Sequence, residues 1–136
     1  MTVVIDCNIF VMCLTSNSPY HFIYQSLVSG KFRLATTVDI LLEYEEVMQR
    51  KYSVSTATAF ITLLNELPNI YYLRPHYQWQ LITIDPDDNK YCDCAIAAEA
   101  AYVVTEDRHF DVLKTIPFPS LTVIGIDHFL EMLKSL

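Results

Sequence analysis

The stretch VVIDCN (residues 3–8) decides the fold class of this chain. Its run of β-branched residues is typical of a buried parallel strand, and the run ends at the carboxylate of Asp6. A second stretch, YVVTED (residues 102–107), repeats this pattern and reaches Asp107. Sites in open parallel sheets lie beyond the carboxyl ends of the strands. We therefore expect Asp6 and Asp107 to meet at one edge of a sheet.

The rest of the chain alternates between strand patterns and helix patterns. Predicted strands cover residues 2–6, 32–36, 102–105 and 121–124, and residues 70–73 look extended. Predicted helices run from Ser18-Pro19 to Gly30, over 38–51, over 54–66, from the turn at 85–89 to about 101, and from a cap at Asp127 onward. Residues 108–114 form a loop or short helix, and no pattern places residues 76–84. This alternation implies an α/β fold with a mainly parallel sheet and helices on both faces.

Length and composition favour one ordinary globular domain over residues 1–136. Hydrophobic residues make up 52% of the chain and charged residues 18%, so disorder is not expected. No apolar run approaches the roughly 20 residues that cross a bilayer, and no basic-then-apolar leader opens the chain, so we expect a cytoplasmic protein without a membrane segment. The cysteines form no C-x-x-C pair, which predicts reduced, buried thiols at Cys7, Cys13, Cys92 and Cys94.

The net charge of −7 argues against a nucleic-acid groove of the usual basic kind. It does not exclude nucleic acid as a substrate, because acids that gather in a pocket and hold cations invert the local field. A pocket of acids also needs such a cation, since like charges packed together are strongly disfavoured. No glycine-rich phosphate motif follows the first strand, so dinucleotide binding has no support.

The predicted helix over residues 38–51 carries three acids, which differ in their angle to its apolar stripe. At about 100° per residue, Glu43 lies roughly 90° from the centre of the stripe, Glu45 roughly 110° away on the opposite flank, and Glu46 roughly 150° away. Glu43 is therefore best placed to reach a site at the edge of the buried face. The alternative is that all three acids form a solvated face that pairs with Arg50 or Lys51.

The predicted helix that starts at Asn89 is apolar nearly all round, which indicates a buried helix. Asp93 projects from it among apolar residues, and a carboxylate there needs a cation or hydrogen-bond donors. A buried structural ion pair is the alternative. Asp87 and Asp88 fit the role of helix caps.

Polar residues beside the two strand ends are further candidates. Asn8 can orient Asp6 or a water molecule, or cap the following segment, and Thr105 can hydrogen-bond a pocket carboxylate, whereas Glu106 should point away. His109 can contact a phosphate or carry a proton, or simply pack in the interior. Candidates for phosphate contacts are Lys31, Arg33, Lys90 and Arg108.

Four segments, VVIDCN (3–8), LLEYEEVMQRK (41–51), DPDDNKYCDCAIAAEA (85–100) and YVVTEDRHF (102–110), together resemble the PIN-domain family, in particular its branch of toxins from bacterial toxin–antitoxin pairs. The resemblance implies a three-layer α/β/α fold, Mg²⁺ or Mn²⁺ as cofactor, cleavage of RNA and a small antitoxin partner. It places the four family acids on Asp6, Glu43, Asp93 and Asp107, with Asn8 and Thr105 in supporting positions. Asp88 precedes Asp93 by five residues and is a competing ligand, so either or both can serve.

Two other functions stay open at this point, and so does a homodimer. Haloacid-dehalogenase-like phosphotransferases also place an aspartate at the end of the first strand and form an aspartyl-phosphate there. They carry a second acid two residues later, where this chain has Asn8. A PIN-like domain that binds a partner without catalysis is the third reading.

Overall fold

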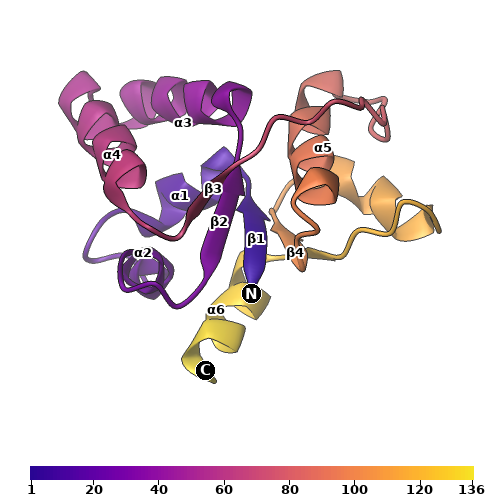
Figure 1. Ribbon diagram of the computed structural model, residues 1–136. Coiled ribbons are helices and arrows are strands. Elements are labelled where there is room, and N and C mark those ends of the chain that lie inside the picture. The colour runs from indigo at the N-terminus through magenta and orange to yellow at the C-terminus, as the bar shows by residue number, and fades with distance from the viewer.

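The computed structural model describes residues 1–136 and is built around one five-stranded sheet (Figure 1). The strand order is β3-β2-β1-β4-β5, and every neighbouring pair is parallel. The strands are β1 (Thr2–Ile5), β2 (Arg33–Thr36), β3 (Ile70–Tyr72), β4 (Tyr102–Val104) and β5 (Val123–Ile124). The predicted α/β class with a mainly parallel sheet is confirmed.

The strand order creates a switch point beside the central strand β1. The chain moves outward from β1 to β2 and β3, then returns to the other side of β1 with β4 and β5. The loops that leave β1 and β4 therefore diverge and open a crevice at their carboxyl ends. Ile5 lies opposite Val104 in the register, so Asp6 and Thr105 leave the sheet side by side.

Helices flank this sheet on both sides, in the expected three-layer α/β/α arrangement. Figure 1 shows the first four helices on one side of β1 and α5 on the other. The helices are α1 (Cys7–Cys13), α2 (His21–Val28), α3 (Val38–Lys51), α4 (Val54–Glu66), α5 (Asn89–Ala97) and α6 (Ile126–Lys134), with short 3₁₀ segments η1 (Pro86–Asp88) and η2 (Arg108–Thr115). No helix combines the length and the apolar character needed to span a bilayer.

The core fixes the helices that carry polar residues toward the crevice. Val3, Val4 and Ile5 are fully buried, as expected of a parallel strand covered on both faces. On one side of the sheet, the ring of Phe10 in α1 lies 5.1 Å from that of Tyr44 in α3 and 5.0 Å from that of Phe60 in α4, centroid to centroid. All four cysteines are buried free thiols, which confirms the prediction.

Helices α3 and α4 have the predicted bounds because both begin at a hydroxyl cap. The Thr37 hydroxyl accepts a hydrogen bond from the Ile40 backbone N–H at 3.2 Å, and the Ser53 hydroxyl accepts one from the Thr56 N–H at 3.1 Å. These are the usual donors for an N-cap side chain.

The other helices differ from the sequence prediction at their ends. The helix predicted to reach residue 101 stops at Ala97, since Glu99 takes the left-handed backbone conformation with φ of 52° and the Ala100 N–H returns to the Ala95 carbonyl at 2.9 Å. The first predicted helix begins at His21, because the Ser18 hydroxyl accepts from the Tyr20 N–H and forms a turn before it.

Two helix starts were wrong or missing in the prediction. The final helix begins after Gly125 and not at Asp127: the Ile126 N–H donates to the Glu106 carboxylate at 3.1 Å, and Asp127 instead accepts from the Tyr20 hydroxyl at 2.8 Å. Helix α1 was not predicted at all. It follows β1 directly, with Asp6 as its N-cap residue.

Candidate metal centre

Asp6 is held at the mouth of the crevice by the end of β1. Its side chain is almost fully buried, and its carboxylate accepts a hydrogen bond from the Thr105 hydroxyl at 2.8 Å. The Thr105 hydroxyl also accepts from the Asp107 backbone N–H at 3.0 Å, so this side chain ties both strand ends together. Burial raises the pKa of Asp6, and the charge of Glu43 adds to this rise. Hydrogen bonds from Thr105, Cys7 and the Asn8 backbone act in the opposite direction and lower the pKa.

Helix α3 brings Glu43 to the same place. One ligand atom from each of Asp6, Cys7 and Glu43 lies within 4.8 Å of the other two. Burial, together with the charges of Asp6 and Glu43, raises the pKa of the Cys7 thiol far above its usual value, so Cys7 stays protonated. The donors that this group offers to a metal are therefore two carboxylates.

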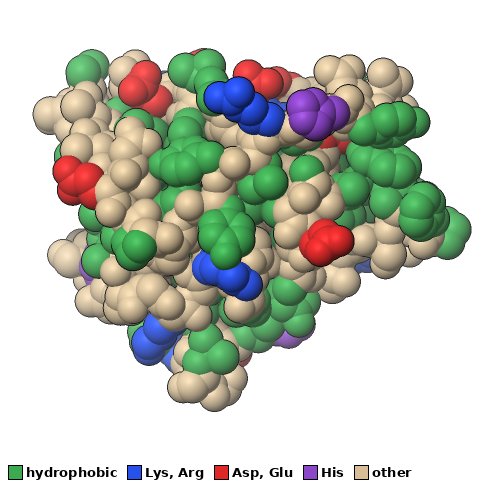
Figure 2. Space-filling model, in the orientation of Figure 1, with side chains coloured by type: hydrophobic (Ala, Val, Ile, Leu, Met, Phe, Trp, Pro, Cys, Tyr) green, Lys and Arg blue, Asp and Glu red, His purple; other side chains and the backbone are tan.

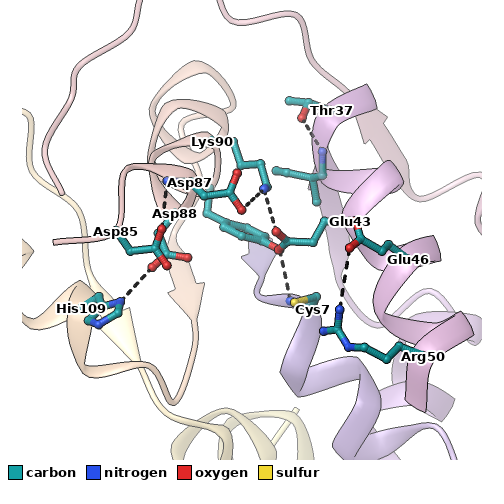
Figure 3. Close-up of polar contacts among 12 residues, drawn as sticks. Cys7, Thr37, Glu43, Glu46, Arg50, Asp85, Asp87, Asp88, Lys90 and His109 are labelled. Atoms are coloured by element: carbon teal, nitrogen blue, oxygen red, sulfur yellow. Dashed lines mark hydrogen bonds and ion pairs between the residues drawn. The ribbon is translucent and has the colours of Figure 1, made fainter. Parts of the chain in front are cut away.

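Both oxygens of Glu43 already have partners (Figure 3). The Tyr91 hydroxyl donates to Oε1, and the Lys90 ammonium lies 2.7 Å from Oε2. Lys90 also lies 3.0 Å from the carboxylate of Asp87. Sequence reasoning named Lys90 only as a phosphate contact and missed Tyr91.

A second acidic group lies at the start of α5 and contains Asp88. Ligand atoms of Asp85, Asp88 and His109 lie within 4.8 Å of one another. His109 Nδ1 lies 3.2 Å from the Asp88 carboxylate and 3.4 Å from that of Asp107. His109 thus joins these acids, although the sequence left open that it merely packs in the interior. Asp85 was not predicted as a site residue.

Asp88 links the two acidic groups electrostatically. Burial raises the pKa of Asp88 to about 6, and the charges of Asp85, Asp107 and Asp6 add to this rise, while the hydrogen bond with His109 opposes it. The partly buried carboxylate of Asp88 is therefore repelled by the carboxylates of Asp6 and Asp107.

The structure does not bring Asp93 into either acidic group. Its carboxylate is half-buried and accepts the Trp79 backbone N–H at 3.1 Å. Asp93 also lines a cavity of about 660 Å³ between α3, α5 and residues 78–87. Five residues of helix separate it from Asp88 by about 140° around the axis, so the two side chains cannot face the same site easily.

Two predicted substrate and support residues lie near the acids without joining them. The side chain of Asn8 is exposed, and its contribution to Asp6 comes through its backbone. Arg108 is exposed and lines a smaller cavity of about 240 Å³ together with Thr105 and Asp107. Glu106 points away from the acids toward α6, as predicted.

The donor set fits a hard divalent cation. Carboxylate oxygens dominate it, the neighbouring acids raise the pKa of Asp88, and the one thiol is protonated. Mg²⁺ and Mn²⁺ prefer oxygen ligands of this kind, whereas soft metals prefer thiolates.

Comparisons with known proteins agree with this architecture. The model of the family described as PIN domain matches residues 2–109. A chain from the crystal structure of VapBC2 from Rickettsia felis, bound to a DNA fragment from their promoter, superposes with a TM-score of 0.64 at 18% identity, over 92% of this chain and 98% of that one. A chain of VapBC-1 from nontypeable Haemophilus influenzae gives 0.62 at 16% identity, over 93% and 99%. No curated protein sequence matches significantly. The chain belongs to the PIN domain family.

Proposed function

We propose that this protein is a metal-dependent endoribonuclease that hydrolyses RNA phosphodiester bonds. The observation that supports the proposal is a linked set of acids from three separate elements. Thr105 hydrogen-bonds the Asp6 carboxylate and the Asp107 N–H, and His109 lies beside the carboxylates of Asp107 and Asp88. Asp6 follows β1, Asp107 follows β4, and Asp88 precedes α5. A site of this kind in a PIN domain has the ligands for metal-assisted hydrolysis.

In this proposal Asp6, Asp88 and Asp107 hold a Mg²⁺ or Mn²⁺ ion. The ion, when bound, supplies a water activated for attack and neutralises charge on the phosphate. Thr105 fixes the Asp6 carboxylate through its hydroxyl, and His109 contacts Asp88 and Asp107 together. These contacts orient the acids before any ion arrives, so little reorganisation is needed when it binds.

Single-stranded or looped RNA suits the site best, because a strand must bend to bring its phosphate to recessed acids. Aromatic rings on the surface provide places where unpaired bases can stack. The rings of Tyr77 and Trp79 lie 4.6 Å apart and those of Trp79 and Phe118 lie 5.9 Å apart, centroid to centroid, and Tyr77 and Phe118 are exposed. Figure 2 shows hydrophobic side chains gathered on the side of the molecule where residues 73–88 run.

Fold likeness supports a proposed biological role. The superposed chains come from VapBC2 and VapBC-1 assemblies, and the match extends over nearly the full length of both partners in each comparison. This supports a toxin of a toxin–antitoxin pair, with a small antitoxin as its protein partner.

The test is cleavage of a labelled single-stranded RNA with Mn²⁺ or Mg²⁺. Wild type should cleave, EDTA should stop the reaction, and Asp6→Asn and Asp88→Asn should lower the rate by at least about 10²-fold, as for other groups that stabilise transition-state charge. Glu131→Gln, an exposed acid on α6, is the matched control and should cleave normally.

Two results would refute the nuclease. Equal activity in wild type and both asparagine variants would show that these acids do not take part. Absence of cleavage together with the absence of any Mn²⁺-induced thermal stabilisation would favour a partner-binding domain without catalysis. A covalent phosphate on Asp6 would favour the aspartyl-phosphate route, which lacks its second acid because position 8 is Asn8.

A further inference from the structure

We propose that the Lys90 ammonium takes the place of a second metal ion in the metal centre. Lys90 neutralises the charge of Glu43, and Glu43 holds Lys90 in position instead of ligating an ion. The carboxylates of the centre then bind one divalent ion. This inference rests on the proposed nuclease function and goes beyond it. The sequence leaves open whether Glu43 completes one metal site or recruits another ion.

The first observation is that the Glu43 carboxylate has no free oxygen. Oε2 lies 2.7 Å from the Lys90 ammonium, and Oε1 accepts the hydrogen bond of the Tyr91 hydroxyl. The same hydroxyl accepts from the Cys7 backbone N–H at 3.4 Å, and Tyr91 is fully buried. Burial raises the pKa of Tyr91 far above its usual value, so it remains a neutral donor. A metal that ligated Glu43 would therefore have to share an oxygen with one of these donors or displace it.

The second observation is the burial of the Lys90–Glu43 pair. Its side chains are 17% and 20% exposed, whereas in the surface pair of Arg50 with Glu46 they are 61% and 75% exposed. Among the lysine and arginine ion pairs of this chain, no other has both partners so far removed from solvent. A recessed charge pair is screened little by salt and therefore keeps its electrostatic effect on the neighbouring acids.

The third observation is that a second acid holds Lys90 from η1, the 3₁₀ segment that precedes α5. The Asp87 carboxylate lies 3.0 Å from the Lys90 ammonium (Figure 3). Two carboxylates on different segments therefore fix the position of the Lys90 ammonium.

These contacts place a permanent positive charge where a second metal ion would otherwise act. Ions in two-metal sites lie about 3.5–4 Å apart and stabilise the attacking and leaving oxygens together. Here a carboxylate oxygen of Glu43 lies within 4.8 Å of one of Asp6, and the Lys90 ammonium lies 2.7 Å from Glu43. An ammonium has three N–H donors, and two of them serve Glu43 and Asp87. The third remains for a phosphate oxygen in the cavity that Lys90 lines.

The experiment counts Mn²⁺ ions bound per chain, by calorimetric titration and by the electron paramagnetic resonance signal of free Mn²⁺. Wild type should bind one ion. Lys90→Met should bind two, because Glu43 loses its cation and can ligate, and Lys90→Arg should again bind one. Lys114→Met, which removes an exposed lysine from η2, is the matched control and should bind one.

Each result decides the question without reference to activity. Two ions in wild type, or one ion with unchanged affinity in a folded Lys90→Met, overturns the inference. If wild type cleaves RNA but binds two ions, only this inference fails. If wild type binds no Mn²⁺ at all, the proposed function fails together with it.

Discussion

At the scale of single residues, the chemistry of the site depends on how each carboxylate meets its neighbours. Asp6 is buried with one hydroxyl donor, Asp88 is partly buried among three other acids, and Glu43 is neutralised by Lys90. Asp93 has a backbone N–H as its partner instead. Only the first two combine burial with unrelieved repulsion, which is the condition that a bound cation relieves.

Asp88 and Asp93 should respond differently to the same substitution. Asp88→Asn should weaken Mn²⁺ binding by more than about 10- to 100-fold, the loss that follows from mutation of even an outer partner of a metal ligand. Asp93→Asn keeps an oxygen that can accept the Trp79 N–H, so Mn²⁺ affinity and RNA cleavage should be unchanged. Mn²⁺ titration of the two variants side by side decides between them. Loss of binding in Asp93→Asn alone would contradict the assignment to Asp88.

The raised pKa of Asp88 makes the metal-free protein sensitive to pH. The pKa is about 6 in the folded protein and about 3.9 in an unfolded chain, so the folded state binds the proton more tightly. Between about pH 4 and pH 6, this group therefore lowers the free energy of unfolding as the pH rises. Asp88→Asn removes that effect.

Urea denaturation in EDTA measures this dependence. The free energy of unfolding of Asp88→Asn, relative to wild type, should grow as the pH rises from about 4 to 6 and then level off. A difference that stays constant over this range, or shrinks, would contradict the pKa rise. The comparison between the two proteins cancels the titration of groups that they share.

At the scale of elements, α3 and α5 carry the side chains that face β1 across the crevice. Helix α3 starts at a hydroxyl cap and is anchored in the core by Tyr44, whose hydroxyl donates to the Ile5 carbonyl. Helix α5 is anchored by Tyr91 and holds the segment before it through Asn89 and Asp93. The positions of Glu43 and Lys90 thus depend on caps and anchors outside the site.

The cap of α3 is open to a direct test. Thr37→Ala removes the side-chain acceptor of the Ile40 N–H and should lower the free energy of unfolding by about 1 kcal/mol. Thr58→Ala, an exposed position within α4, is the control and should leave it nearly unchanged or raise it slightly, because alanine favours helix. Equal losses in both variants, measured by urea denaturation, would show that the hydroxyl cap contributes nothing.

The segment around Ile82, which precedes α5, should become more mobile when its hydrogen bonds to Asn89 are removed. The Asn89 side chain accepts the Ile82 N–H and donates to the Ile82 carbonyl, both at 2.8 Å. Asn89→Ala removes two hydrogen bonds worth about 0.5–1.5 kcal/mol each, so amides around residue 82 should exchange with solvent faster. Asn17→Ala, an exposed control, should leave this exchange unaltered. Unchanged exchange in Asn89→Ala would mean that another contact holds the segment.

At the scale of the whole molecule, the features that the sequence predicted well are local. The strand ends at Asp6 and Asp107 follow from apolar runs, and the bounds of α3 and α4 follow from Thr37 and Ser53 with their hydroxyl caps. The parallel sheet follows from the alternation of elements. Each depends on residues close together in the chain.

The features that sequence reasoning missed depend on contacts between distant segments. The chain turns at Glu99, which has a positive φ, and Ala101 then donates to the carbonyl of Thr2 in β1. Helix periodicity gives no sign of this contact between distant segments. The sequence left open whether Asp88 or Asp93 serves, and the structure groups Asp88 with Asp85 and His109 while Asp93 accepts the Trp79 N–H. The ion pair of Lys90 with Glu43 joins residues 47 positions apart, so no local sequence pattern predicts it.

The chemistry of the cleaved RNA ends distinguishes hydrolysis by an activated water from other routes of cleavage. Single-stranded RNA is incubated with wild-type protein and Mn²⁺ in water enriched in ¹⁸O, and the masses of the fragments are measured by mass spectrometry. If the clustered acids serve an ion that activates water, one ¹⁸O atom enters a linear phosphate monoester at each cut, and Asp6→Asn forms this product at least about 10²-fold more slowly. A 2′,3′-cyclic phosphate without ¹⁸O, or cleavage that persists in EDTA, would contradict the account.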